Sequence, residues 1–320
     1  MICIKIRARE MCHIGMWDAG RSRCESLRLP PTSWDLGRGK LMTYKTILTV
    51  RSAPDGSTTA LDQAEAMVRR ANGHLDVLCL GVDRTRVGYY DGGANAIAIN
   101  TLLDRAREEV QATEAHTEQH LAGSDVPRAI STAIAPFGDI SRITSHHARF
   151  SDLVVMDLPY SKGQGPEVEP IVEAALFDTR TPVLVMPEGT ELAASPKTVL
   201  VAWDESIEAL TAVRKALPLL QAADLVRITI IDPPKHGIER SDPGGMLCQM
   251  LARHGVACEI DVLSKTLPRI SDVLCRHATD TEAELIVMGA YGHSRFRESI
   301  LGGATRNMLE HAKVPVLMAH

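Results

Sequence analysis

The sequence predicts an α/β protein that consists of two tandem doubly wound domains, each with a mostly parallel five-stranded sheet flanked by helices. The chain has 320 residues, which is long enough for two hydrophobic cores. Strands rich in Val, Ile and Leu alternate with segments whose apolar residues recur every three or four positions, the pattern of a parallel sheet covered on both faces. The same series of segments occurs twice, which indicates an internal repeat.

The repeated elements follow one another in the same order in both halves. Each half starts with a short apolar strand after a lysine, continues with a helix and a second strand, and later has two further apolar strands. The matching pairs are Lys45–Val50 with Lys197–Ala202, Thr58–Asn72 with Ser206–Gln221, His74–Asp83 with Leu225–Asp232, Ser151–Met156 with Ala283–Met288, and Pro182–Met186 with Pro315–Met318.

The two halves differ in their middle sections. The first half inserts Arg84–Asn100 before a long polar helix near Ile99–Leu121, whereas the second half has a Pro/Gly-rich loop at Pro233–Gly245. The polar segment Glu188–Pro196, which contains Gly and Pro, is expected to be the linker between the halves.

The first 41 residues show no sustained periodicity and no signal-peptide pattern. Cys3, Cys12, His13 and Cys24 do not have the spacing of a zinc site. Because Met42 directly precedes a strand, we expect residues 1–41 to be a mis-called extension or a disordered tail. The two domains are then expected at residues 42–190 and 196–320.

Composition excludes several classes of protein. Hydrophobic residues make up 45% of the chain and charged residues 23%, as in soluble globular proteins. The formal net charge is −5 and no basic stripe occurs, so nucleic acid is not an expected partner. No apolar run approaches the roughly 20 residues that span a bilayer. The seven cysteines lack the pattern of a secreted disulfide scaffold, which favours buried free thiols and a cytoplasmic location.

A glycine cluster in the second half is the main functional signal. Gly289 and Gly292 follow a buried strand, and Gly302 and Gly303 precede a helix with Thr305 in its first turn. Ligands bind at the carboxyl ends of strands in such sheets, and glycines with a helix N-terminus suit phosphate groups. Tight turns and a helix cap explain the same glycines equally well. The spacing matches neither a Walker A loop nor the dinucleotide fingerprint.

This stretch resembles the ATP-binding signature of the universal stress protein family: Gly, two residues, Gly, nine residues, Gly, then Ser or Thr. Gly289, Gly292 and Gly302 match the three glycines, whereas Gly303 stands where the family has Ser or Thr. Thr305 falls where many members have a second hydroxyl. The resemblance covers Met42 to His320 and implies a Rossmann-like fold related to the adenine nucleotide alpha hydrolases.

The resemblance also implies the remaining parts of a nucleotide site. Asp204, just after the first strand of the second half, takes the position that contacts the nucleoside, although an N-terminal helix cap is the alternative role. Ala202 and Ile230 match residues that line the adenine pocket in the family, and an ordinary place in the hydrophobic core is the alternative for both. Met288 directly precedes the glycine motif. Arg295, Arg297 and Arg306 lie in or beside the glycine loop; such side chains most often face solvent, and contact with phosphates or acidic partners is the less common alternative. His293 is expected to be an exposed loop residue rather than a catalyst.

The first half is expected to have lost this site. Ser52 stands in place of Asp204, and neither early glycine of the motif follows Met156. Pro159 removes a backbone donor there, and Gly163 and Gly165 indicate only a flexible loop.

Three classes of function remain open. The first is an adenine-nucleotide-binding stress or signalling protein that holds ATP in the second domain, with Mg²⁺ as a companion of the phosphates. The second is an interaction protein of the same family without ATP. The third is an ATP-hydrolysing enzyme, for which the sequence offers no nucleophile elbow, paired carboxylates or metal cluster; we therefore name no catalytic residue. The family also implies dimerisation through the final strands, so we expect a pseudo-dimer within this chain, with unidentified protein partners or a homo-oligomer as further options.

Overall fold

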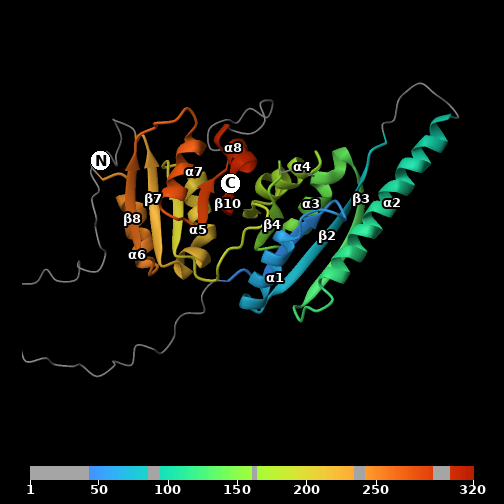
Figure 1. Cartoon of the computed structure of the whole chain (residues 1–320), viewed down its shortest axis with the longest axis horizontal. Coiled ribbons are helices and arrows are strands. Elements are labelled where there is room, and N and C mark those ends of the chain that lie inside the picture. The colour runs from blue at the N-terminus through green and yellow to red at the C-terminus, as the bar shows by residue number, and fades with distance from the viewer. Residues whose placement is uncertain (1–42, 86–93, 161–163, 234–241, 291–302) are drawn as a thin grey trace, which may run out of the picture.

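The computed structural model describes residues 43–85, 94–160, 164–233, 242–290 and 303–320. The described residues form a 10-stranded sheet with helices on both faces (Figure 1). The predictions for residues 1–41, Gly163, Gly292, His293, Arg295, Arg297 and Gly302 concern residues that lie outside these ranges.

The first half of the chain supplies five strands and four α-helices among the described residues. In order these are β1 (Thr46–Arg51), α1 (Thr59–Ala71), β2 (His74–Asp83), α2 (Ala94–His120), β3 (Arg128–Pro136), α3 (Ile140–Ala148), β4 (Leu153–Asp157), α4 (Val168–Glu173), a π-helical turn (Ala174–Asp178) and β5 (Val183–Met186). A 3-10 turn (Phe137–Asp139) precedes α3.

The second half repeats this series with shorter middle elements. Its described elements are β6 (Thr198–Ala202), α5 (Ile207–Ala222), β7 (Leu225–Ile231), α6 (Gly245–Arg253), β8 (Cys258–Leu263), α7 (Ile270–Asp280), β9 (Leu285–Gly289), α8 (Gly303–His311) and β10 (Val316–Ala319). The predicted α/β class, with mostly parallel strands between helices, is confirmed.

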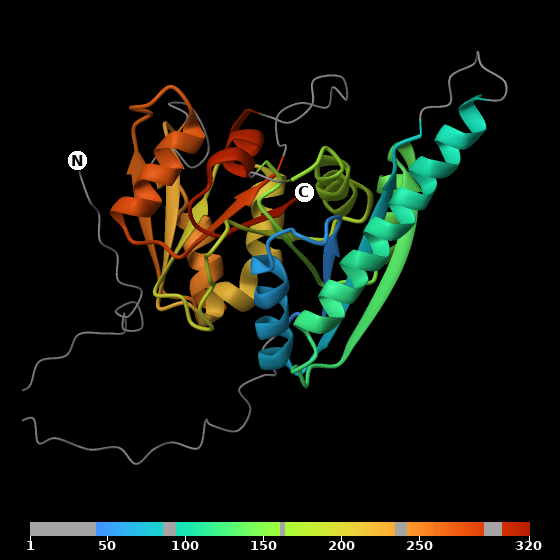
Figure 2. The same cartoon turned by 45° about the vertical axis from the view of Figure 1, so that its right-hand side comes forward.

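The strand order is β3-β2-β1-β4-β5-β10-β9-β6-β7-β8, so the two halves meet at their last strands. All neighbours within each half pair in parallel, whereas β5 and β10 pair antiparallel with Leu184 opposite Leu317. The prediction that the final strands pair within the chain is confirmed. The halves lie side by side along the long axis of the molecule, with α2 at the outer end of the first half (Figures 1 and 2).

Two hydrophobic clusters fill the space between the sheet and its helices. One joins strand residues to α1, α2, α5 and α6, and the other joins them to α3, α4, α7 and α8. Strand residues such as Leu48, Leu184 and Val287 are fully buried. The strands are therefore covered on both faces, which explains why they read as continuous apolar runs rather than alternating ones.

Side chains also tie the two halves together away from the sheet. The Tyr44 hydroxyl donates to the Lys215 carbonyl at 2.6 Å, which fixes the beginning of the first half to α5. The linker is anchored by Gln63, whose side chain exchanges two hydrogen bonds with the backbone of Leu192. The ring of His320 packs edge-on against Phe177 with centroids 4.8 Å apart. The linker is therefore part of the packed structure.

The structure corrects three details of the sequence-based expectations. The long helix of the first half starts at Ala94, within the stretch predicted to be an insertion, because that stretch contains alanines with high helix propensity. Gly245, predicted to end a loop, is the first residue of α6. The last strand ends at Ala319 rather than Met318.

Candidate functional site

The carboxyl ends of β6 and β9 mark the crevice expected from the topology. β6 and β9 are neighbours, with Val201 opposite Val287. The chain leaves β6 toward α5 and leaves β9 toward α8, and these helices pack into the two different core clusters. Connections that depart to opposite faces open a crevice at this edge, which is where open α/β sheets bind ligands.

Asp204 lies at this edge and is exposed. One of its oxygens, Oδ1, accepts hydrogen bonds from the backbone N–H of Ser206 at 3.1 Å and from the Ser206 hydroxyl at 2.6 Å. Ser206 Oγ in turn accepts from the backbone N–H of Ala209 and is the N-cap of α5. The predicted cap role thus belongs to Ser206, and Asp204 holds that cap in place. This brace fixes the orientation of a carboxylate that can accept hydrogen bonds from sugar hydroxyls.

An apolar wall stands beside Asp204. Ile230 is buried, and Ala202 and Trp203 are half-buried. Gly244 lies against this wall with φ +76°, and a Cβ there would come within 2.9 Å of Ile230 Cδ1. The indole N–H of Trp203 is buried without a hydrogen-bond partner in the described part of the chain. Sequence reasoning missed Trp203, because its neighbours come from distant segments.

Gly289, the first glycine of the motif, has a packing role in the structure. A Cβ at this position would lie 2.6 Å from the backbone N of Ala209 and 2.8 Å from the carbonyl C of Glu208. Only glycine therefore allows the end of β9 to approach the first turn of α5. Met288, just before it, is buried with 6% exposure, so its side chain belongs to the core.

The first turn of α8 contains three of the residues that the sequence singled out. Gly303 is the first residue of the helix, and a Cβ there would meet no atom of the described residues within 4 Å. Thr305 is buried, with 3% exposure. The Arg306 Nε donates a hydrogen bond to Glu310 Oε1 at 2.8 Å. The guanidinium also lies over the ring of Tyr160 from the first half, 5.3 Å from the ring centroid. The hydrogen bond to Glu310 and the nearby Tyr160 raise the pKa of Arg306.

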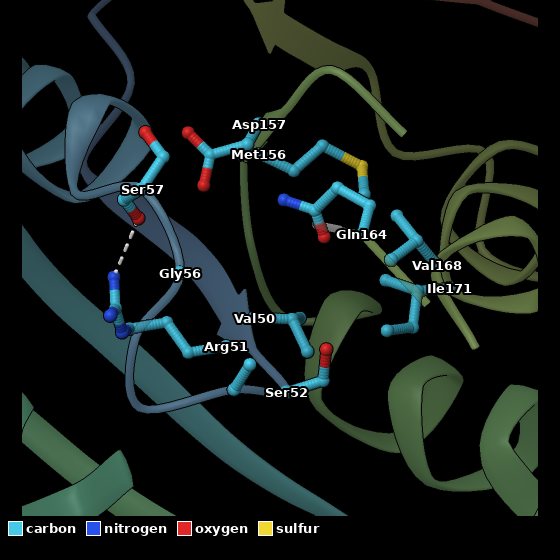
Figure 3. Close-up of a pocket in the computed structure, with 11 residues that line it drawn as sticks. Val50, Arg51, Ser52, Gly56, Ser57, Met156, Asp157, Gln164, Val168 and Ile171 are labelled. Atoms are coloured by element: carbon cyan, nitrogen blue, oxygen red, sulfur yellow. Dashed lines mark hydrogen bonds between the residues drawn. The ribbon is translucent and has the colours of Figure 1, made fainter. Parts of the chain in front are cut away.

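The equivalent edge of the first half is shaped by a carboxylate instead of a glycine. Asp157, labelled in Figure 3, ends β4 as Gly289 ends β9. Its Oδ1 accepts a hydrogen bond from the backbone N–H of Ala60 in the first turn of α1. Burial is the largest effect on Asp157 and raises its pKa, against hydrogen bonds from Ala60 and Ser57. Sequence reasoning missed this contact.

Arg51 lies beside Asp157 and donates to the Ser57 carbonyl at 3.0 Å (Figure 3). Its Nε and Nη2 have no partner among the described residues, and burial lowers its pKa, with the charge of Asp157 opposing that effect. The cavity bordered by these residues and Gln164 has a volume of about 30 Å³. That volume suits water, whereas small-molecule sites usually span about 300–1,000 Å³.

Metal-binding clusters and membrane-spanning helices are both absent from the described residues. Within those ranges, no group of three or more His, Cys, Asp or Glu side chains is arranged to hold a metal ion. None of the helices in the described part of the chain combines the length and apolar composition that crossing a bilayer requires.

Comparison with known proteins adds an independent finding. Residues 249–320 match the model of the universal stress protein family. Universal stress protein Slr1230 from Synechocystis sp. (strain ATCC 27184 / PCC 6803 / Kazusa) is 29% identical over 128 residues, which is 37% of this chain and 41% of that protein. The alignment thus covers less than half of the relative's own length.

Solved structures extend the likeness to both halves. A universal stress protein from Archaeoglobus fulgidus DSM 4304 has a TM-score of 0.60 at 15% identity, over 87% of this chain and 99% of that one. A similar structure from Pseudomonas aeruginosa UCBPP-PA14 has a TM-score of 0.53 at 15% identity, over 86% and 93% of the two chains. At these identities the likeness is one of fold. Residues 249–320 therefore match the universal stress protein family, and the fold of both halves is similar to that of universal stress proteins of known structure.

Proposed function

We propose that the chain is an adenine-nucleotide-binding stress or signalling protein of the cytoplasm, with ATP held by the second of two domains at residues 42–190 and 196–320. The observation that carries the proposal is the position of the Asp204 carboxylate, held by Ser206 beside an apolar wall at the carboxyl end of β6, next to β9. Asp204 would accept hydrogen bonds from the ribose hydroxyls, and Ala202, Ile230 and Trp203 would border the base.

The phosphate side of this proposal rests on the glycine motif and on α8. The backbone near Gly289 and Gly303, together with Gly292 and Gly302, would approach the phosphate oxygens, and Thr305 would add a hydroxyl. The N-terminus of α8 favours negative charge because its first N–H groups have no partner within the helix. Mg²⁺ would be bound through the phosphates, since it usually keeps several waters and few protein ligands.

A second candidate is an interaction protein that no longer binds ATP. Two observations favour it: Gly303 lacks the hydroxyl of the family signature, and Arg306 is already paired with Glu310 and Tyr160. Hydrolysis of ATP is the third and weakest candidate, because the described site presents no nucleophile with an adjacent base.

Calorimetry with ATP on matched variants separates these candidates. Asp204→Ala should weaken binding by about 1.5–3 kcal/mol, the range for a hydrogen bond to a charged group. Ser206→Ala removes the cap of α5 but keeps the carboxylate, so it should lower stability more than affinity. Ser52→Ala, at the matching position of the first half, should leave affinity unchanged. Absence of heat for the wild type at millimolar ATP would favour the interaction protein, and equal affinity in all four proteins would mean that the pocket is elsewhere.

A further inference from the structure

Cys248 and Cys258 form a thiol pair at the outer edge of the second half. Cys248 lies on α6, and Cys258 is the first residue of β8, the last strand of the sheet. Their sulfur atoms are 2.9 Å apart, and the Cys258 sulfur is also 3.5 Å from the Cys248 carbonyl oxygen. The two thiols are therefore already in contact, and small shifts would bring them to bonding distance.

The two thiols differ in exposure and in acidity. Cys258 is buried, with 4% exposure, whereas Cys248 is half-buried and reachable from solvent. The hydrogen bond from Cys258 lowers the pKa of Cys248 to about 7. The same contact, with burial, raises the pKa of Cys258. Cys248 is thus suited to react as a thiolate, whereas Cys258 stays protonated as a thiol.

We propose that Cys248 and Cys258 are a peroxide-sensitive dithiol that closes to a disulfide between α6 and β8. The Cys248 thiolate attacks the outer oxygen of a hydroperoxide; the O–O bond breaks, Cys248 becomes a sulfenic acid, and the other oxygen leaves as an alcohol or water after taking a proton. The Cys258 sulfur then attacks the sulfenic sulfur, which releases water and forms the S–S bond. The two thiols together lose two electrons, and the peroxide is reduced.

The disulfide would fasten α6 to the sheet next to the candidate nucleotide site. Gly244, the N-cap of α6, lies against Ile230 and Trp203, so the linked helix also borders the apolar wall. The segment between the two cysteines turns at Gly255, whose φ of +79° suits glycine. The bond therefore closes a short local loop and requires no movement between the halves.

The other described cysteines are natural controls. Cys79 is buried, and its desolvation raises the pKa of its thiol. Cys275 is half-buried, as Cys248 is, but its sulfur lies 3.6 Å from the thioether of Met308 and its pKa is raised by burial. Neither has a second thiol beside it in the described structure.

The test uses the full chain with Cys3, Cys12 and Cys24 changed to serine, so that those three thiols cannot exchange. The protein is treated with one equivalent of hydrogen peroxide, blocked with N-ethylmaleimide and digested with trypsin. Arg253 lies between the two cysteines, so the bond would join peptide 241–253 to peptide 254–265 with the loss of two hydrogen atoms. We expect this linked pair, and its loss on treatment with dithiothreitol. Unlinked peptides after peroxide, or Cys248 joined to any other cysteine, would overturn the proposal.

A second measurement follows the attacking thiol alone. In Cys258→Ser, no second thiol is present to convert the Cys248 sulfenic acid into a disulfide, so dimedone should trap that sulfenic acid on peptide 241–253. The control Cys275→Ser should still form the disulfide between peptides 241–253 and 254–265. In the unoxidised parent at pH 7, iodoacetamide should modify Cys248 at least roughly tenfold faster than Cys275, since the thiolate is the nucleophile. Equal rates at the two cysteines would contradict the assignment of Cys248 as the attacking thiol.

Discussion

Replacing Gly289 by alanine tests how closely β9 must approach α5 beside the candidate site. The added Cβ would lie 2.6 Å from the backbone N of Ala209 and 2.8 Å from the carbonyl C of Glu208. Neither atom can rotate away as a side-chain end could, so α5 or β9 must shift. Overpacking of this kind typically costs about 1–3 kcal/mol. At about 2–4 °C per kcal/mol, the melting temperature should fall by roughly 2–12 °C.

The matched control is Gly303→Ala, because a Cβ at Gly303 meets no atom within 4 Å among the residues that the structure describes. Alanine is favoured over glycine inside a helix by up to about 1 kcal/mol, so this variant should match or exceed the wild type in stability. Both variants would be followed by urea unfolding with circular dichroism. If Gly289→Ala were as stable as the wild type, or if both variants fell equally, the packing argument would be wrong.

Three further predictions concern the start of the chain, pH and the site. A protein beginning at Met42 should keep the wild-type melting temperature within a few degrees. One beginning at Lys45 lacks Tyr44 and its hydrogen bond to Lys215, so it should melt at a lower temperature. Equal melting temperatures of the two truncated proteins would contradict a stabilising role for Tyr44. Burial raises the pKa of Asp157 above its unfolded value, so the folded state holds the proton more tightly. The free energy of unfolding relative to Asp157→Asn should therefore fall as the pH rises from below the ordinary pKa of an aspartic acid to above it; a rise over this range in urea titrations would contradict the prediction. Gly303→Ser restores the hydroxyl of the family signature at a position where no described residue obstructs it, so it should tighten ATP binding by up to roughly tenfold in calorimetry; an unchanged affinity would mean that phosphate does not reach this residue.

The strands and their succession along the chain were the part most open to prediction. Each is a run of Val, Ile and Leu, and the repeat tells which runs correspond, since Leu153–Met156 has the same place in the first half as Leu285–Met288 in the second. The pairing of β5 with β10 came from the family resemblance, because nothing local in two short apolar strands specifies an antiparallel partner. The start of α2 was misplaced, since the preceding glycines hid a helix that begins at Ala94.

The contacts within the site were harder to predict. Asp204 and Ser206 are close in sequence, yet only the structure shows that Ser206 caps α5 and that Asp204 supports it. The approach of Gly289 to Ala209 joins segments that are far apart in the chain, and so does the contact of Arg306 with Tyr160. Sequence spacing predicts which residues reach the edge of the sheet but not which of them already have partners there.

The most direct test of the account is mass spectrometry of small molecules released when freshly purified protein is denatured. We expect an adenine nucleotide in a near one-to-one ratio with the wild-type chain, the same ratio in Ser52→Ala, and a marked loss in Asp204→Ala. Wild-type protein without nucleotide, and without calorimetric heat when ATP is added back, would contradict the central claim. Full retention of the nucleotide by Asp204→Ala would contradict the placement of the site between β6 and β9.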